Sequence, residues 1–246
     1  MLRILYMAIK TLLVSLTLFG IGNAGFAPFT DADILTGKAI PAGDTAKYLQ
    51  IEAEADQDEF VIKHFCDSLS VFSAVNIKKG AKVIDIGTGA GFPGVPMKIA
   101  RPDIDLTLLD SLNKRIRFLS EIVLSSDILS SETIHGRAED YSKMNEYREK
   151  YDIAVSRAVA NLSSLCEYCL PFVKVGGYFI SMKGPDYDEE LKQSKNAVDV
   201  LGGAVEEVVS LTLPDGSTRN IIKIKKVKNT PSKYPRRGVK INKTPL

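Results

Sequence analysis

The residues best placed to do chemistry lie in one glycine-rich segment, Val83-Ile84-Asp85-Ile86-Gly87-Thr88-Gly89-Ala90-Gly91-Phe92-Pro93-Gly94. Its branched residues predict a short buried strand, and its glycines predict a tight turn into a helix. Glycine has no Cβ, so such a turn lets the backbone approach a bound molecule closely. The segment therefore indicates a ligand-binding loop, with a purely structural turn as the alternative.

Two kinds of cofactor suit a loop of this type. The dinucleotide fingerprint G-x-G-x-x-G needs glycine where this chain has Phe92, so a nicotinamide cofactor fits less well. S-adenosylmethionine has no phosphate, and it presents an amino-acid end and two free ribose hydroxyls. Asp85 and residues 87–91 are candidates to hold the amino-acid end, and Asp110 is a candidate to accept from the ribose.

The elements that must position this loop alternate along the chain. Strands are predicted over residues 83–86, 106–110, 133–135, 152–155 and 178–182, with helical patterns between them and a break at Gly176-Gly177 before the fifth strand. Two more strands, 205–213 and 218–227, flank the turn Pro214-Asp215-Gly216. The pattern predicts an α/β fold, with a doubly wound, mostly parallel sheet closed by an antiparallel C-terminal strand pair.

Three regions follow from this pattern. Residues 1–76 are expected to form a helical or irregular cap that includes an amphipathic helix over 60–72. Residues 77–228 form the predicted Rossmann-like domain. Residues 229–246, rich in proline and lysine, are expected to form an extended, weakly ordered basic arm.

Charge is unevenly distributed although the formal net charge of the 246-residue chain is only +2. No acidic residue follows Asp215, whereas lysine and arginine recur up to Lys243. A polyanion such as RNA is a natural partner for this end of the chain, and a solvated, solubilising face is the alternative. A composition of 45% hydrophobic and 25% charged residues is typical of a globular protein and argues against general disorder.

The three cysteines favour a reducing compartment, because their odd number does not suit a disulfide framework. Cys166 and Cys169 have the spacing C-x-x-C, but they fall within an apolar helical pattern and are interpreted as core thiols. No second paired spacing is present, so no metal is expected.

The first 25 residues resemble a secretory signal, since Arg3 and Lys10 precede an apolar run over 11–21 and small residues follow it. A buried N-terminal helix is the alternative. The run is too short to span a bilayer, so no membrane association is expected. We expect a cytoplasmic protein.

Several blocks of sequence resemble, in order, the bacterial small-subunit ribosomal RNA guanine-N7 methyltransferase family, once called glucose-inhibited division protein B. The blocks are Lys63-His64-Phe65-Cys66-Asp67-Ser68, residues 85–96, residues 108–115, His135-Gly136-Arg137-Ala138-Glu139, Ser156-Arg157-Ala158-Val159-Ala160, Lys183-Gly184 and Tyr234-Pro235-Arg236-Arg237. The resemblance implies a class I S-adenosylmethionine-dependent methyltransferase that methylates N7 of a guanine in 16S rRNA. It also implies cofactor contacts by Gly87, Phe92, Ala138, Glu139 and Arg157, in addition to Gly89 and Asp110.

The chain departs from this family at one place. Members carry an Asn-rich stretch before the His-Phe helix, and residues 39–57 contain nothing similar. If that stretch shapes a pocket, its loss would impair activity.

The remaining expectations concern RNA and the reaction. Arg137, Lys183, Arg236 and Arg237 are candidate RNA contacts, and Glu139 either accepts from the adenine amino group or caps the following helix. Guanine N7 has a free lone pair and no proton to lose, so no catalytic base is required. The expected partner is 16S rRNA or the small ribosomal subunit, and the protein is expected to be a monomer. The rivals are an NAD-dependent oxidoreductase and a non-enzymatic RNA-binding protein with a vestigial cofactor site.

Overall fold

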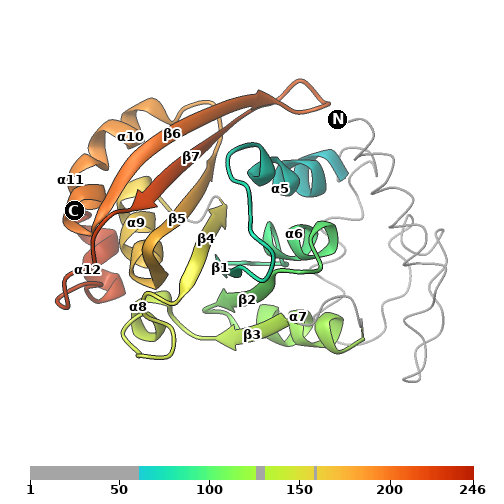
Figure 1. Cartoon of the computed structure of the whole chain (residues 1–246), viewed down its shortest axis with the longest axis horizontal. Coiled ribbons are helices and arrows are strands. Elements are labelled where there is room, and N and C mark those ends of the chain that lie inside the picture. The colour runs from blue at the N-terminus through green and yellow to red at the C-terminus, as the bar shows by residue number, and fades with distance from the viewer. Residues whose placement is uncertain (1–60, 126–130, 158–159) are drawn as a thin grey trace.

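The computed structural model describes residues 61–125, 131–157 and 160–246 of the chain (Figure 1). The signal-like segment 1–25 and the divergent segment 39–57 lie outside these described residues. No helix within the described ranges has the length and apolar character needed to cross a membrane.

One seven-stranded sheet forms the centre of the structure, with the strand order β3-β2-β1-β4-β5-β7-β6. The strands are β1 Lys82–Ile86, β2 Asp105–Asp110, β3 Ser131–His135, β4 Tyr151–Arg157, β5 Val173–Lys183, β6 Gly203–Thr212 and β7 Thr218–Lys226. The first five strands are parallel, and β7 pairs antiparallel with both β5 and β6. This topology confirms the predicted mostly parallel sheet and its antiparallel C-terminal pair.

Helices cover both faces of the sheet (Figure 1). One face carries α5 Asp67–Leu69, the 3₁₀ turn η2 Ser70–Ser73, α6 Gly94–Ala100 and α7 Asn113–Ser125. The other face carries α8 Ala138–Tyr141, α9 Leu162–Cys169, the 3₁₀ turn η4 Leu170–Phe172, α10 Asp188–Gln193 and α11 Lys195–Val200. Because both faces are covered, the inner strands are apolar on both sides: Val83 packs in one core and Ile84 in the other.

The fifth strand is longer than expected. It runs through Gly176-Gly177, where the sequence predicts a break. A Cβ at Gly177 would lie 2.4 Å from the carbonyl oxygen of Asp152, so glycine allows the two strands to approach at an irregularity in their register. The glycines therefore mark a close backbone contact within the strand.

Helical structure precedes the sheet, as expected, but not as one regular α-helix. The described part of the predicted helix consists of a π-helical turn, η1 Val61–Cys66, followed by α5 and η2. The predicted core thiols, Cys166 and Cys169, are fully buried in α9. Burial raises the pKa of both thiols above its ordinary value.

The expectation of an extended, weakly ordered C-terminal arm is wrong. The segment contains a helix, α12 Gly238–Lys243, and it buries Tyr234 and Ile241. Arg148 donates from Nη2 to the Thr230 carbonyl at 2.7 Å and from Nη1 to the Tyr234 carbonyl at 3.0 Å. These side chain to backbone contacts and the apolar burial hold the segment against the α8 and α9 face.

An ion pair anchors the same segment. Glu167 on α9 is fully buried, and it accepts from the backbone N–H of Arg236 at 2.7 Å and from Nη2 of the same residue at 2.7 Å. The Arg236 side chain is 15% exposed. Arg236 therefore neutralises a carboxylate that has no access to water.

Removal of the Arg236 guanidinium should leave the buried Glu167 carboxylate without its cationic partner. We expect Arg236→Ala to lower the free energy of unfolding by about 3 kcal/mol. The matched control is Arg237→Ala, because Arg237 is the exposed neighbour, and its effect should stay within about 0.5 kcal/mol. Urea denaturation measures both. Equal losses for the two variants would contradict the assigned role of the Glu167 ion pair.

Candidate functional site

The carboxyl ends of four parallel strands meet at one edge of the sheet. Ile86 of β1 pairs with Leu109 of β2, and Asp110 pairs with His135 of β3. On the other side β1 pairs with β4, which ends at Arg157. The strand order reverses direction between β1 and β4, and ligands of open α/β sheets bind at such a switch point.

A cavity of about 610 Å³ opens at this edge. It is lined by seven of the predicted cofactor residues, which are Gly87, Gly89, Phe92, Asp110, Ala138, Glu139 and Arg157. The predicted RNA residue Arg137 also lines it. The fold therefore brings together residues that come from four different strand ends.

The glycine loop forms one wall of the cavity. Gly87, Gly89 and Gly91 all have positive φ angles, of 71°, 61° and 103°, which favour glycine. A Cβ on Gly89 would meet no other atom within 4 Å, so the backbone there is open on the cavity side. Gly91 instead packs inward, where a Cβ would lie 2.7 Å from the Val95 side chain.

Asp85 supports this loop from beneath and does not line the cavity, in contrast to the predicted role at the amino-acid end of a cofactor. Its side chain is completely buried, and its Oδ2 atom accepts from the Thr88 hydroxyl at 2.7 Å and from the Gly94 N–H at 2.8 Å. Burial raises the pKa of Asp85 from 3.8 to about 6, against the effect of these hydrogen bonds.

Asp110 links the glycine loop to the end of the second strand. Its Oδ2 accepts from the Gly89 N–H at 2.9 Å, and its Oδ1 accepts from the Leu112 N–H at 2.8 Å. Arg115 donates to the same Oδ2 at 3.3 Å. Since each carboxylate oxygen has two lone pairs, Oδ1 keeps one that the described residues do not use, on a nearly buried side chain that lines the cavity.

Glu139 presents a second carboxylate from the start of α8. It is buried, and its Oε1 lies 3.8 Å from Nη1 of Arg137. The alternative that Glu139 caps this helix is wrong, because the N-cap position is Arg137 and no side chain bonds there. Tyr168 of α9 and Asn242 of α12 line the cavity beside it.

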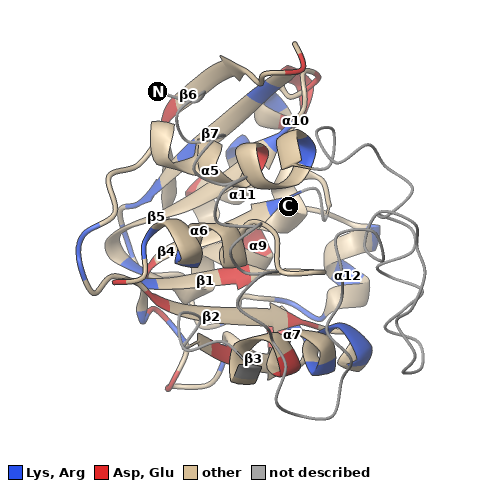
Figure 2. Ribbon diagram, turned by 90° about the vertical axis from the view of Figure 1, so that its right-hand side faces the viewer, with Lys and Arg blue, Asp and Glu red and all other residues tan. Residues whose placement is uncertain are grey.

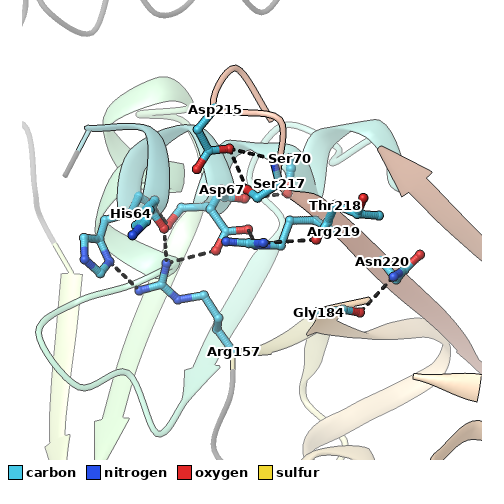
Figure 3. Close-up of polar contacts among 12 residues, drawn as sticks. His64, Asp67, Ser70, Arg157, Gly184, Asp215, Ser217, Thr218, Arg219 and Asn220 are labelled. Carbon is cyan, nitrogen blue, oxygen red and sulfur yellow. Dashed lines mark hydrogen bonds and ion pairs between the residues drawn. The ribbon is translucent and has the colours of Figure 1, made fainter. Parts of the chain in front are cut away.

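Arg157 is held at the other end of the cavity by the N-terminal helical turns (Figure 3). Its Nη1 donates to the Asp67 carboxylate and to the Lys63 carbonyl, both at 3.2 Å. Its guanidinium carbon lies 5.2 Å from the centre of the Phe92 ring, a distance typical of a cation–π contact. Arg157 therefore lines the cavity with its position fixed from two sides.

His64 completes this group as a neutral acceptor. A guanidinium can only donate, so the 3.2 Å contact between Arg157 Nη2 and His64 Nδ1 requires an unprotonated Nδ1. Burial, followed by the charge of Arg157, lowers the pKa of His64 to about 4. This contact gives His64 a structural role, as the partner that helps to hold Arg157.

Asp67 also pairs with a second arginine. Its Oδ1 lies 3.2 Å from Nε of Arg219 on β7, so that Asp67 lies between two guanidinium groups in Figure 3. Sequence reasoning missed Asp67, Arg219, Tyr168 and Asn242. Asp67 was visible only as part of a matched block, and no local pattern marks the other three.

Two of the predicted RNA contacts are paired within the protein and nearly buried. Lys183 donates to the Ala160 carbonyl at 2.8 Å and pairs with Glu190 at 2.7 Å, with 9% of its side chain exposed. Arg236 is paired with Glu167, as described above. Arg137 is 69% exposed and Arg237 is also exposed, so these two stay candidates for RNA contact.

Comparison with known proteins identifies the family. The profile of the GidB family, described as rRNA small subunit methyltransferase G, matches residues 45–222. The chain belongs to this family. It is 52% identical over 199 residues to the ribosomal RNA small subunit methyltransferase G of Clostridium novyi, covering 80% of this chain and 82% of that protein. The corresponding protein of Alkaliphilus oremlandii is 54% identical, with 80% and 83% covered.

Solved structures agree on the fold. A SAM-dependent methyltransferase from Aquifex aeolicus superposes with a TM-score of 0.55 at 19% identity, covering 76% of this chain and all of that one. Aeropyrum pernix fibrillarin, solved with S-adenosyl-L-methionine bound, gives 0.51 at 17% identity, with 63% and 73% covered. The GidB chain therefore has the class I methyltransferase fold, as predicted.

The raised pKa of Asp85 predicts a pH-dependent stability. The native state keeps a proton on this carboxyl that the unfolded state releases above about pH 4. Asp85 therefore contributes stability below that pH which is lost as the pH rises through about 6. Relative to Asp85→Asn, whose side chain stays neutral, the wild type should lose about 3 kcal/mol of unfolding free energy between about pH 4 and pH 7.

Urea denaturation at a series of pH values measures this difference. Other titrating groups such as His64 are present in both proteins, so their contributions cancel. A difference that does not change with pH would show that Asp85 keeps its ordinary pKa.

Proposed function

We propose that this chain transfers the methyl group of S-adenosylmethionine to N7 of a guanine in 16S rRNA. The observation that carries the proposal is membership of the GidB family, with relatives about half identical over most of the chain. The cavity at the switch point supports it, because the residues that the family resemblance assigns to the cofactor line one space. The loop departs from the dinucleotide fingerprint at Phe92, which disfavours the oxidoreductase alternative.

The cavity fits the cofactor in size and in chemistry. Its volume of about 610 Å³ is within the usual range for small-molecule sites. The open backbone at Gly89 suits the amino-acid end, and Asp110 Oδ1 has one acceptor lone pair left for a ribose hydroxyl. We assign Ala138 and Glu139 to the adenine, and Phe92 and Arg157 to the end of the cavity near the sulfonium.

The chain's part in the reaction is orientation. The cofactor supplies an electrophilic methyl group, and guanine N7 supplies a lone pair that needs no base. Two carboxylates, Asp110 and Glu139, line the described cavity, and both are assigned to the cofactor and not to proton transfer. Holding the two reactants in line is then the main source of rate, up to roughly 7–11 kcal/mol in favourable cases.

Basic residues near the cavity supply contacts for RNA. Arg137 lines the cavity with an exposed side chain, and Lys240 and Lys243 are exposed on α12. Figure 2 shows lysine and arginine on both α7 and α12. Such groups favour a polyanion through charge. A monomeric enzyme in the cytoplasm, acting on 16S rRNA or the small subunit, completes the proposal.

Blocking the open face of Gly89 should prevent cofactor binding. We expect Gly89→Ile to weaken the binding of S-adenosylhomocysteine by at least about tenfold, because the new side chain would enter the cavity. Gly176→Ile is the matched control, since Gly176 also has a positive φ and open surroundings but lies on β5 away from the cavity. Calorimetry that finds equal losses for both variants would contradict this role of the loop.

The position of the methyl group tests the function itself. The purified protein is incubated with labelled S-adenosylmethionine and with small subunits or 16S rRNA, and the RNA is then reduced and cleaved with aniline. N7-methylguanosine should give one specific cut. Arg157→Ala should reduce cutting at least about tenfold, because the cofactor and the guanine would be held less firmly in line. Arg101→Ala, which loses only a surface pair with Asp103, should not.

Two outcomes would overturn the proposal. Label on a ribose hydroxyl, on an exocyclic amine or on protein alone would exclude N7 methylation. No transfer to any RNA, with the cofactor bound, would favour the RNA-binding alternative.

A further inference from the structure

The C-terminal segment reaches the cofactor cavity although it lies beyond residues 45–222, which the family profile matches. Asn242 of α12 lines the cavity together with Glu139 and Tyr168. The chain that leads into this helix is held by the ion pair of Arg236 with Glu167. It is also held by the two hydrogen bonds that the Arg148 guanidinium donates to backbone carbonyls of the segment. The position of Asn242 is therefore fixed by contacts at a distance from the cavity.

Gly238, the first residue of α12, packs directly against the Glu139 carboxylate. A Cβ built on Gly238 would lie 2.2 Å from Glu139 Oε1 and 3.1 Å from its carboxylate carbon. Only glycine lets the helix approach this closely. The segment thus confines the same Glu139 oxygen, Oε1, that faces Arg137 Nη1.

The Asn242 amide is oriented by Tyr168. The Tyr168 hydroxyl donates to Asn242 Oδ1 at 3.1 Å, which leaves the two Nδ2 hydrogens available. Within the described part of the chain Nδ2 makes no hydrogen bond, and the Asn242 side chain is exposed. Its place at the cavity is not explained by a need to satisfy a buried amide.

We infer that Asn242 is a further cofactor-binding residue, whose Nδ2 donates to a ring nitrogen of the adenine while Glu139 accepts from the adenine amino group. The inference rests on the proposed function, since it assumes that the cavity holds S-adenosylmethionine. An adenine edge presents an amino donor beside ring-nitrogen acceptors, N1 on one side and N7 on the other. A carboxylate next to an amide donor is complementary to that edge.

The test measures binding and not methyl transfer. Affinities for S-adenosylhomocysteine and for its 1-deaza and 7-deaza analogues are determined by calorimetry for the wild type, Asn242→Ala and Val239→Ala. Val239 is exposed on the same helix and does not line the cavity, so its variant is the matched control. Thermal unfolding without ligand checks that all three proteins are equally folded.

Asn242→Ala should weaken S-adenosylhomocysteine about three- to tenfold, as expected for one lost hydrogen bond, and Val239→Ala should not. The loss should vanish for the one analogue that lacks the contacted nitrogen, because that bond is then already absent. Gly238→Ala, which must displace Glu139 or α12, should also weaken binding.

Each failure has a separate meaning. Wild-type affinity in Asn242→Ala, or a loss that persists with both analogues, would overturn the contact with the base while leaving the proposed function intact. Failure of the wild type itself to bind S-adenosylhomocysteine would overturn the proposed function, and the inference with it.

Discussion

A buried carboxylate holds the glycine loop in place, and the rest of the site depends on it. Asp85 has no access to water, so its oxygens need donors from the protein. Thr88 and Gly94 supply them to Oδ2, which ties both ends of the intervening loop to the end of β1. Glycine is required at position 94, because a Cβ there would lie 2.9 Å from that same oxygen. The open backbone at the cavity is therefore set before a ligand arrives, and binding need not organise it.

A second buried carboxylate arranges positive charge at the other end of the cavity. Asp67 pairs with Arg157 from β4 and with Arg219 from β7. Two guanidinium groups share one carboxylate while His64 stays neutral, and the charge of Arg219 also acts on Asp215. Arg157 is held by these protein contacts before a ligand arrives. A ligand would therefore meet Arg157 already in position, which avoids a large ordering cost.

The parts of this structure that were predictable are those governed by local pattern. Strands buried on both faces give apolar runs in the sequence, and the clustered glycines indicate the turn after the first strand. What escaped prediction depends on partners distant in sequence. Gly176 and Gly177 indicated a break before the fifth strand. Gly177 is in fact explained by the Asp152 carbonyl, which approaches it closely from a neighbouring strand. Arg236 and Lys183 were interpreted as RNA contacts because nothing in the sequence shows that Glu167 and Glu190 lie against them.

The C-terminal segment shows why composition alone misassigns such a tail. Prolines and cations are typical of an unpacked arm. The entropy cost of ordering this segment is nevertheless offset by the burial of Tyr234 and Ile241 and by one buried ion pair. Once it is ordered, Lys240, Asn242 and Lys243 are all exposed, but of these three only Asn242 lines the cavity. Under the function and the inference proposed above, the same short helix would serve two ligands, RNA through its cations and the cofactor through its amide. Removing the whole segment would also leave Glu167 without its cation, so separate substitutions at Asn242 and at Lys240 with Lys243 distinguish the two roles, whereas a deletion does not.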